Sequence, residues 1–160
     1  MTGKRWMRWA SWALCALLLA ACASGPARRV SEPTARIQQL TVLADGNWST
    51  ELRIENFSSI PMRFDSVQFA LSVDGQDAGT LAAQPALTIG PESADVITMT
   101  LSPSVAAKLA VADALARKRG LDYTLEGTVA ATPDEQRQRE YKLKRSSALS
   151  PTPGLPGVLR

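Results

Sequence analysis

The stretch Trp48-Ser49-Thr50-Glu51-Leu52-Arg53-Ile54-Glu55 decides the fold class of this chain. Trp, Thr, Leu and Ile stand at its even positions, and polar or charged residues stand at its odd positions. Because successive side chains of a strand point to opposite faces of a sheet, this alternation predicts a half-buried β-strand. Further strands are predicted on both sides of it, over residues 36–43, 62–73, 76–82, 87–89, 94–101, 122–131 and 136–145. A mostly β chain with about seven to eight strands indicates an antiparallel β-sandwich.

Two local signals refine the long strand over 62–73. Its apolar residues change phase between Phe64 and Val67, which predicts a bulge near Asp65-Ser66. The strand ends at Asp74-Gly75, a dipeptide typical of a tight hairpin. The next strand is therefore expected to return antiparallel beside it.

One helix is predicted near residues 103–119. Ser102 is a suitable N-cap, Pro103 a favoured first helical residue and Gly120 a suitable C-terminal cap. Apolar residues recur at helical spacing and predict a narrow face that packs on the sheet: Val105, Leu109, Ala112 and Leu115/Ala116.

The first 21 residues have the layout of a secretory signal. The basic residues Lys4, Arg5 and Arg8 precede an apolar run over 10–21. That run is shorter than the ~20 residues of a membrane-spanning helix, although an uncleaved anchor stays an alternative. The sequence Leu19-Ala20-Ala21-Cys22 resembles the lipobox of bacterial lipoproteins. The resemblance implies cleavage between Ala21 and Cys22 and attachment of diacylglycerol and an N-acyl chain to Cys22. Because Ala23 follows, it also implies the outer membrane, facing the periplasm.

Cleavage there divides the chain into four parts and changes its charge. Residues 1–21 are the predicted signal peptide, 22–35 an acylated flexible tether, 36–146 the sandwich domain and 147–160 a disordered proline-rich tail. The whole chain has 18 Lys and Arg against 15 Asp and Glu. The three basic residues of the signal account for the whole excess, so the mature chain is neutral. Neutrality and export argue against nucleic acid as a partner.

Four segments of the domain resemble the late-embryogenesis-abundant type 2 family, also called the water-stress and hypersensitive-response (WHy) domain. They are Leu52-Arg53-Ile54-Glu55-Asn56-Phe57, Phe69-Ala70-Leu71-Ser72-Val73-Asp74-Gly75, Ile89-Gly90-Pro91-Glu92-Ser93 and Tyr123-Thr124-Leu125-Glu126-Gly127. The family's Asn-Pro-Asn is reduced here to Asn56-Phe57-Ser58. The resemblance covers about 36–145 and implies a fibronectin-III-like sandwich with one helix between strands. It also implies a role in desiccation or envelope stress and no established catalytic residues. Bacterial members are often lipoproteins.

The sequence contains few residues suited to catalysis or to metal binding. The chain has no histidine, and acylation would consume Cys22. The carboxylates Asp65, Asp74 and Asp77 lie close in sequence, but a bulge and a turn account for them better than a hydrolytic pair. We therefore expect no enzyme activity, no metal and no cofactor beyond the lipid on Cys22.

Interaction surfaces are the remaining candidates. Phe57, Ile60 and Met62 around Pro61 are predicted to form an exposed apolar surface. Basic clusters at 117–119 and 137–145 could meet anionic headgroups, or could complement a helix end and protect an edge strand. The predicted function is a non-enzymatic envelope lipoprotein whose sandwich binds or protects, with envelope proteins or lipids as partners. The alternative is an accessory subunit of an envelope assembly or lipid-handling complex.

Overall fold

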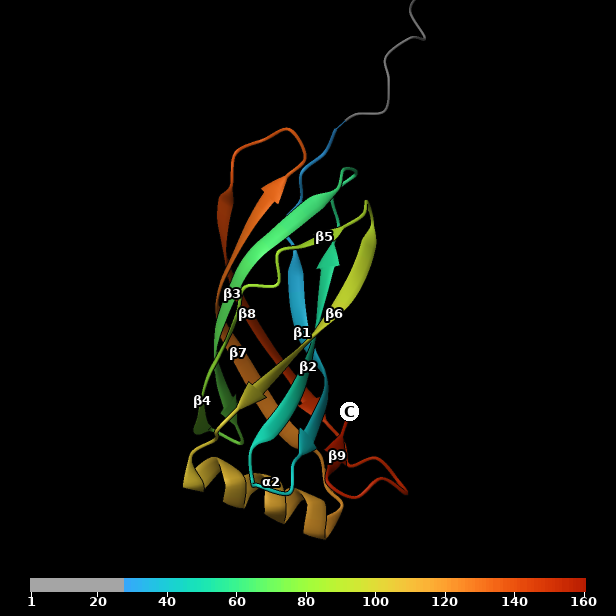
Figure 1. The fold of residues 1–160 in the computed structure, drawn as a ribbon. Helices are drawn as coiled ribbons and strands as arrows, with labels where there is room; N and C mark the ends of the chain where they lie inside the picture. The colour runs from blue at the N-terminus through green and yellow to red at the C-terminus, as the bar shows by residue number, and fades with distance from the viewer. Residues whose placement is uncertain (1–27) are drawn as a thin grey trace, which may run out of the picture.

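Residues 28–160 are described by the structure, a computed structural model, and they form nine strands and one helix (Figure 1). The strands are β1 (Thr34–Val42), β2 (Trp48–Asn56), β3 (Met62–Val73), β4 (Gln76–Ala83), β5 (Leu87–Ile89), β6 (Ser93–Leu101), β7 (Leu121–Pro133), β8 (Arg139–Leu149) and β9 (Val158–Leu159), and the helix is α2 (Val105–Arg117). The predicted signal peptide, its cleavage site and Cys22 lie outside the described residues.

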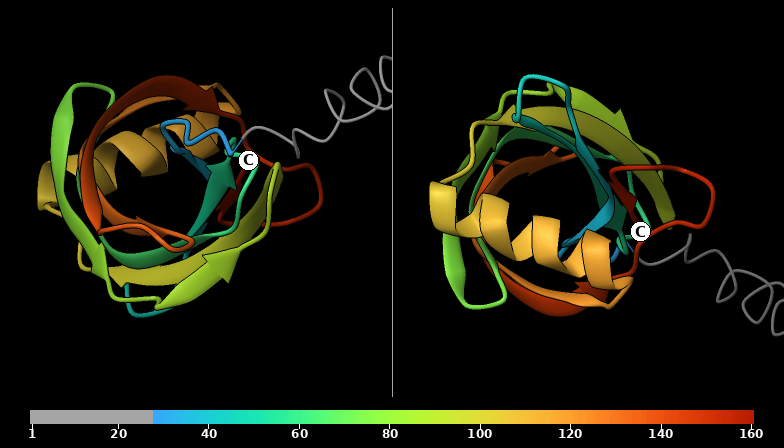
Figure 2. Two further views of the ribbon diagram at one scale, coloured as in Figure 1. Left: turned by 90° about the horizontal axis from the view of Figure 1, so that it is seen from above. Right: turned by 90° about the horizontal axis from the view of Figure 1, so that it is seen from below.

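The strands form two antiparallel sheets that face each other. One sheet has the order β6-β2-β1-β9 and the other β4-β3-β7-β8, with β5 paired to β3. Viewed along the strands, the two sheets curve around a common interior and α2 crosses one end (Figure 2). The predicted antiparallel sandwich with a single helix is confirmed for the part of the chain that the structure describes.

The core follows from the alternation that the sequence shows. In β2 the side chains of Trp48, Leu52 and Ile54 are fully buried, while their neighbours lie toward the outer face. In β3 the register with β7 shifts between Phe64 and Ser66, which confirms the predicted bulge at Asp65. The hairpin is also confirmed, because Asp74 and Gly75 both have positive φ, as a tight two-residue turn requires.

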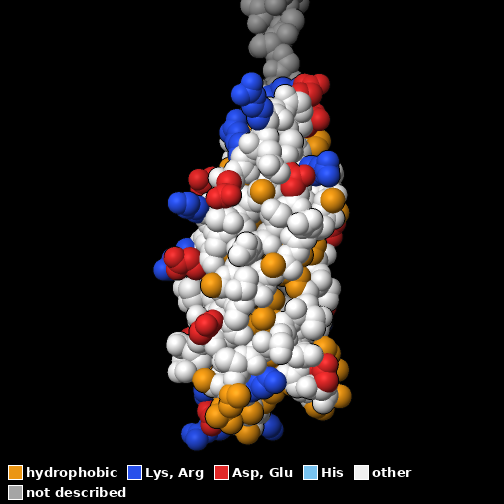
Figure 3. All heavy atoms as spheres, turned by 60° about the vertical axis from the view of Figure 1, so that its left-hand side comes forward, with side chains coloured by type: hydrophobic (Ala, Val, Ile, Leu, Met, Phe, Trp, Pro, Cys, Tyr) orange, Lys and Arg blue, Asp and Glu red, His pale blue; other side chains and the backbone are white. Residues whose placement is uncertain are grey.

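The helix turns a different face to the sheet than the spacing predicted. Its buried residues are Ala107, Val111 and Ala114, whereas Val105 is 75% exposed and Leu109 66%. The helix lies against β4, across the end of the sandwich, where small side chains allow a close approach. Val105 and Leu109 consequently point outward at the end that carries α2, where hydrophobic side chains are visible on the surface (Figure 3).

Both predicted helix ends are also wrong by about two residues. Ser104, not Ser102, is the N-cap, and its hydroxyl accepts the N–H of Ala107. Lys118, not Gly120, is the left-handed C-cap residue, and its N–H bonds to the carbonyls of Ala114 and Leu115. The backbone of a single lysine therefore does what a glycine does in many helices.

The predicted disordered tail over 147–160 is ordered, which corrects the domain boundaries. Strand β8 continues to Leu149, and β9 pairs with β1 through Leu40↔Leu159 and Thr41↔Val158. Leu159 is fully buried. Gly154 and Gly157 have positive φ and shape the loop that returns the chain to the sheet. The proline and glycine content therefore marks a structured return rather than disorder.

Candidate functional site

The loop between β2 and β3 is held rigidly by one buried side chain, Asn56. The Nδ2 of Asn56 donates to the carbonyl oxygens of Ile60 at 3.0 Å, Ile89 at 3.1 Å and Gly90 at 2.9 Å. Its Oδ1 accepts the backbone N–H of Ser58 at 2.9 Å. Because Asn56 is only 1% exposed, these bonds replace all of its contacts with water. The side chain thus ties the loop to the turn between β5 and β6.

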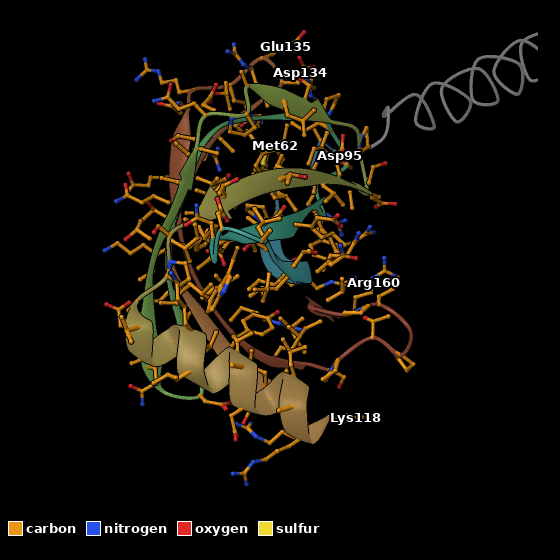
Figure 4. The ribbon with its side chains drawn as sticks, turned by 60° about the horizontal axis from the view of Figure 1, so that its bottom comes forward. Met62, Asp95, Lys118, Asp134, Glu135 and Arg160 are labelled. Atoms are coloured by element: carbon orange, nitrogen blue, oxygen red, sulfur yellow. The ribbon has the colours of Figure 1, made fainter. Side chains whose placement is uncertain are left out.

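The predicted apolar surface around Pro61 is largely internal. Phe57 is 46% exposed, but Ile60 is 6% exposed and Met62 is fully buried. Met62 begins β3 and lies within the sandwich (Figure 4). The expectation of an exposed set is therefore wrong for Ile60 and Met62. Asn56 holds the Ile60 carbonyl, and Met62 lies in β3 between Ile89 of β5 and Pro133 of β7. Phe57 alone remains available to a partner.

A groove of about 410 Å³ lies beside Phe57. The strands β2 and β6 and the chain before β1 supply its walls. Four charged side chains line it: Arg29, Arg53, Glu55 and Glu92. The groove is therefore polar and balanced in charge, with one half-exposed aromatic ring at its side.

Opposite charges in the groove are paired. The Nε of Arg53 donates to Glu55 at 2.8 Å, and Arg29 donates to Glu92 at 3.3 Å. The hydrogen bond from Arg53, together with the charges of Arg53 and Arg36, holds the pKa of the Glu55 carboxyl below its usual value. Glu55 is consequently ionised at neutral pH.

The chain before β1 is fastened to the same end of the domain. Arg28 forms ion pairs with Asp134 at 3.1 Å and with Glu135 at 2.6 Å. The backbone N–H of Arg29 donates to the Ser59 hydroxyl at 2.8 Å. We call this end, formed by residues 28–31, 57–61 and 132–138, the tether end. It lies opposite the end that carries α2 and Lys118 (Figure 4). From Arg28 onward, the predicted tether over 22–35 is therefore bound to the domain.

The three sequence-predicted carboxylates do not form a pair. Asp65, at the tether end, accepts hydrogen bonds from Thr132 at 2.7 Å and Gln138 at 3.0 Å. These bonds and the charge of Arg63 lower the pKa of Asp65. Asp74, at the opposite end, forms an ion pair with Arg119 at 2.7 Å. Asp77 accepts the N–H of Gly79 within β4. Each carboxylate therefore stabilises a bulge, a turn or a strand.

Basic residues of the two predicted clusters are partly neutralised. Arg117 pairs with Asp113 at 2.7 Å, and Arg119 bridges Asp74 and Asp113. In β8, which lies at the edge of its sheet, Lys144 pairs with Glu126 at 2.7 Å. The cluster at 117–119 thus stabilises the C-terminal end of α2. The cluster at 137–145 lies on an edge strand, where basic side chains discourage pairing with other chains.

Residues 28–160 contain neither a cluster suited to a metal ion nor a helix suited to spanning a membrane. No group of three or more His, Cys, Asp or Glu side chains in this part of the chain could hold a metal ion. No helix among the same residues is long and apolar enough to cross a membrane.

Comparison with known proteins identifies the class to which this sandwich belongs. The sequence profile of the family described as "Late embryogenesis abundant protein" (LEA_2) matches residues 51–143. The chain therefore belongs to this family, as the four sequence segments predicted. Membership supports a stress-related domain of a class that is generally non-enzymatic. No curated protein matches the chain.

Two solved structures are similar to this chain at low sequence identity. The solution structure of a protein from Arabidopsis thaliana matches with a TM-score of 0.51 and 9% identity, covering 81% of this chain and 87% of that one. The crystal structure of a protein from Archaeoglobus fulgidus matches with a TM-score of 0.45 and 12% identity, covering 78% of this chain and 98% of that one. At this identity the Arabidopsis likeness supports the fold and nothing further.

Sequence reasoning found Phe57 but missed the groove beside it. The charged residues of the groove come from three separate segments, near 29, 53–55 and 92. Only the tertiary structure brings these segments together. Asn56 belongs to one of the segments that resemble the family, yet its neighbours in sequence do not indicate its three carbonyl partners.

Proposed function

We propose that this protein is a non-enzymatic envelope lipoprotein whose sandwich serves as a binding or protective module, with a role in desiccation or envelope stress. Cys22 carries diacylglycerol and an N-acyl chain, and the mature domain faces the periplasm from the outer membrane. Its partners are the membrane and envelope proteins or lipids, and it uses no metal and no other cofactor. Membership in the late embryogenesis abundant family supports the stress-related and non-enzymatic parts of this proposal.

The observation that carries the proposal is the way residues 28–31 are fastened to the loops 57–61 and 132–138. Five residues, 23–27, lie between Cys22 and Arg28, the first described residue, so the chain takes six residue steps from one to the other. Fully extended, six residues reach about 20 Å. Since Arg28 is clamped by Asp134 and Glu135, an acyl anchor on Cys22 keeps the tether end within that distance of the bilayer. Two or three acyl chains make such an anchor durable.

Lipidation is tested by replacing Cys22 in the cell. Cys22→Ala is expected to abolish palmitate labelling and to move the protein out of the membrane fraction. Cys15→Ala is the matched control, because Cys15 belongs to the segment that is cut away, and it should keep both properties. A Cys22→Ala protein that stays in the membrane fraction would support an uncleaved anchor instead.

The stress role is tested separately with a deletion strain. Loss of the protein should reduce survival under drying, osmotic or detergent stress, and complementation should restore it. Wild-type survival under all three conditions contradicts the protective role. The binding role is tested independently, by crosslinking in membranes.

The half-exposed Phe57 beside a charged groove favours one alternative, an accessory subunit of an envelope assembly or lipid-handling complex. Crosslinking in membranes followed by purification distinguishes the two functions. A single partner recovered in stoichiometric amount, and lost with Phe57→Ser, supports the accessory subunit. Absence of such a partner together with a stress phenotype supports the protective module.

A further inference from the structure

We propose that the groove beside Phe57 binds a zwitterionic phospholipid headgroup, one that carries both a phosphate and a primary ammonium, from the bilayer that holds the anchor. The bilayer as the source of this ligand rests on the proposed lipidation of Cys22. The chemistry of the groove and its place at the tether end carry the rest.

The cationic side of the groove has unused hydrogen-bond donors. Arg53 is fixed to Glu55 through its Nε, and within residues 28–160 neither of its Nη groups has a partner. Arg29 uses its Nη2 for the carbonyl of Phe57 and for Glu92, which leaves Nη1 free among the described residues. A planar guanidinium fork of this kind matches the oxygens of a phosphate.

The anionic side of the groove selects against a simple anion. Glu55 and Glu92 line the same space as the two arginines, so the four charges cancel. A phosphate alone would be repelled by the two carboxylates, and an ammonium alone by the two guanidinium groups. A headgroup with both charges can place its phosphate on Arg53 and its ammonium on Glu92.

Binding requires little rearrangement of the groove. The Arg29–Glu92 pair must open, but its side chains are 62% and 69% exposed. Ion pairs this exposed contribute little to stability, so their exchange for a ligand costs little. The floor of the groove stays in place because Asn56 is fixed by its bonds to three carbonyls.

Phe57 supplies the apolar part of the site. Its ring is 46% exposed and lines the groove. Apolar rings such as that of Phe are found on the membrane-facing side of interfacial segments, buried at the boundary between the headgroups and the acyl chains. We therefore place Phe57 against the glycerol and first acyl carbons of the lipid whose headgroup fills the groove.

The short tether makes a weak site sufficient. A short flexible linker holds a tethered partner at an effective concentration in the millimolar range. A headgroup site with a dissociation constant in that range would be occupied at the anchoring membrane, although it would capture little lipid in free solution. Occupancy would orient the domain upright, with α2 directed away from the bilayer (Figure 1).

The test uses the chain 23–160, which carries no acyl group. Residues 28–160 contain both sheets, α2 and every described core contact, and the dispersed amide spectrum of the chain verifies its fold. Short-chain phosphatidylethanolamine, phosphatidylcholine and phosphatidylglycerol, and inorganic phosphate, are titrated while amide NMR shifts are recorded. We expect shifts at residues 53–57 and 92–94, and at least fivefold tighter binding of the ethanolamine lipid than of the other three probes.

Variants assign each group its role. Glu92→Gln should reduce the affinity for the ethanolamine lipid to that for the choline lipid, and Arg53→Gln should weaken both at least tenfold. Phe57→Ala should weaken the lipid but leave binding of free phosphoethanolamine unchanged. Lys144→Gln is the control, because Lys144 lines a separate shallow hollow over β7 and β8, and it should change nothing.

Three results would overturn the proposal. They are equal affinity for the ethanolamine and choline lipids, equal affinity for inorganic phosphate, and shifts confined to residues outside the groove. Because the titrated chain has no acyl group, the outcome is independent of the Cys22→Ala experiment. Failure of lipidation and failure of the headgroup site are therefore distinguishable.

Discussion

Gly127 in β7 is the position where the smallest change is expected to have the largest effect. It pairs with Phe69 of β3 on one side and with Leu143 of β8 on the other. A Cβ built on Gly127 would lie 2.0 Å from the carbonyl oxygen of Gln68 and 2.8 Å from the Cα of Phe69. Both contacts are with backbone, which cannot rotate away as a side chain can. In Gly127→Ala the central strands β3 and β7 must therefore move apart.

The cost of this movement can be estimated from its parts. Forcing an extra carbon into a packed interior costs about 1–3 kcal/mol. Stretching one or two ladder hydrogen bonds adds about 1 kcal/mol for each. Alanine also leaves the unfolded chain with less conformational entropy than glycine does, which offsets the loss of stability by about 0.5–1 kcal/mol. We expect Gly127→Ala to lower the free energy of unfolding by about 2–4 kcal/mol, with a fall in Tm of about 6–15 °C.

Urea unfolding of the chain 23–160 measures this difference directly. The sequence has tryptophans at 6, 9, 12 and 48, so only the fully buried Trp48 remains in this chain and its fluorescence reports on the core. Gly120→Ala is the matched control. A Cβ at Gly120 would lie 3.8 Å from the Leu149 carbonyl, an ordinary contact, and we expect a change below about 0.5 kcal/mol. A Gly127→Ala protein within 1 kcal/mol of wild type, with an unchanged urea dependence, would refute the reasoning.

Three further predictions use the same unfolding assay. Asn56→Ala should destabilise the domain by about 2–4 kcal/mol, because three carbonyls lose their donor, and an unchanged midpoint would contradict the network around Asn56. Leu159→Ala should lower the free energy of unfolding by about 2–4 kcal/mol, since Leu159 is fully buried. Leu155→Ala is the control and should cost little, because this side chain is 49% exposed. Equal effects of the two substitutions would support a disordered tail. The pKa of Asp65 is lowered in the folded state, so its stabilising contribution is present above the unfolded pKa of about 3.9 and is lost as the pH falls through the lower folded value. The midpoint should accordingly fall less steeply below pH 4 in Asp65→Asn than in wild type, and parallel curves would show that Asp65 does not contribute.

Local patterns predicted the strands well because each pattern acts within a few residues. The alternation in β2, the change of phase at Asp65 and the Asp74-Gly75 turn are all present in the structure as expected. The start of β3 at Met62 and the whole of β5 also match their predicted bounds. In each case the side-chain period or the turn chemistry is enough, because neighbouring residues determine both.

The helix shows where local patterns mislead. Its apolar residues support two overlapping faces, and the spacing of Val105 and Leu109 is as helical as that of Ala107, Val111 and Ala114. Packing against β4 favours the face with the smaller side chains, because the helix crosses the sandwich end at close range. The size of the side chains between α2 and β4 decided which face of the helix is buried, and the periodicity of apolar residues does not depend on their size.

The sequence by itself determined the antiparallel sandwich class and the family, since both depend on residues that are close together in the chain. The export signal stays a prediction of the sequence. The tertiary structure alone decided that the proline-rich tail becomes β9, that α2 presents Val105 and Leu109 outward, and that Arg29, Arg53 and Glu92 share one groove with Phe57. Each of these features joins segments from 22 to more than 100 residues apart. Such contacts form only when two surfaces match in shape and charge. Because this match is a property of the pair of segments, the sequence of one segment alone does not predict it.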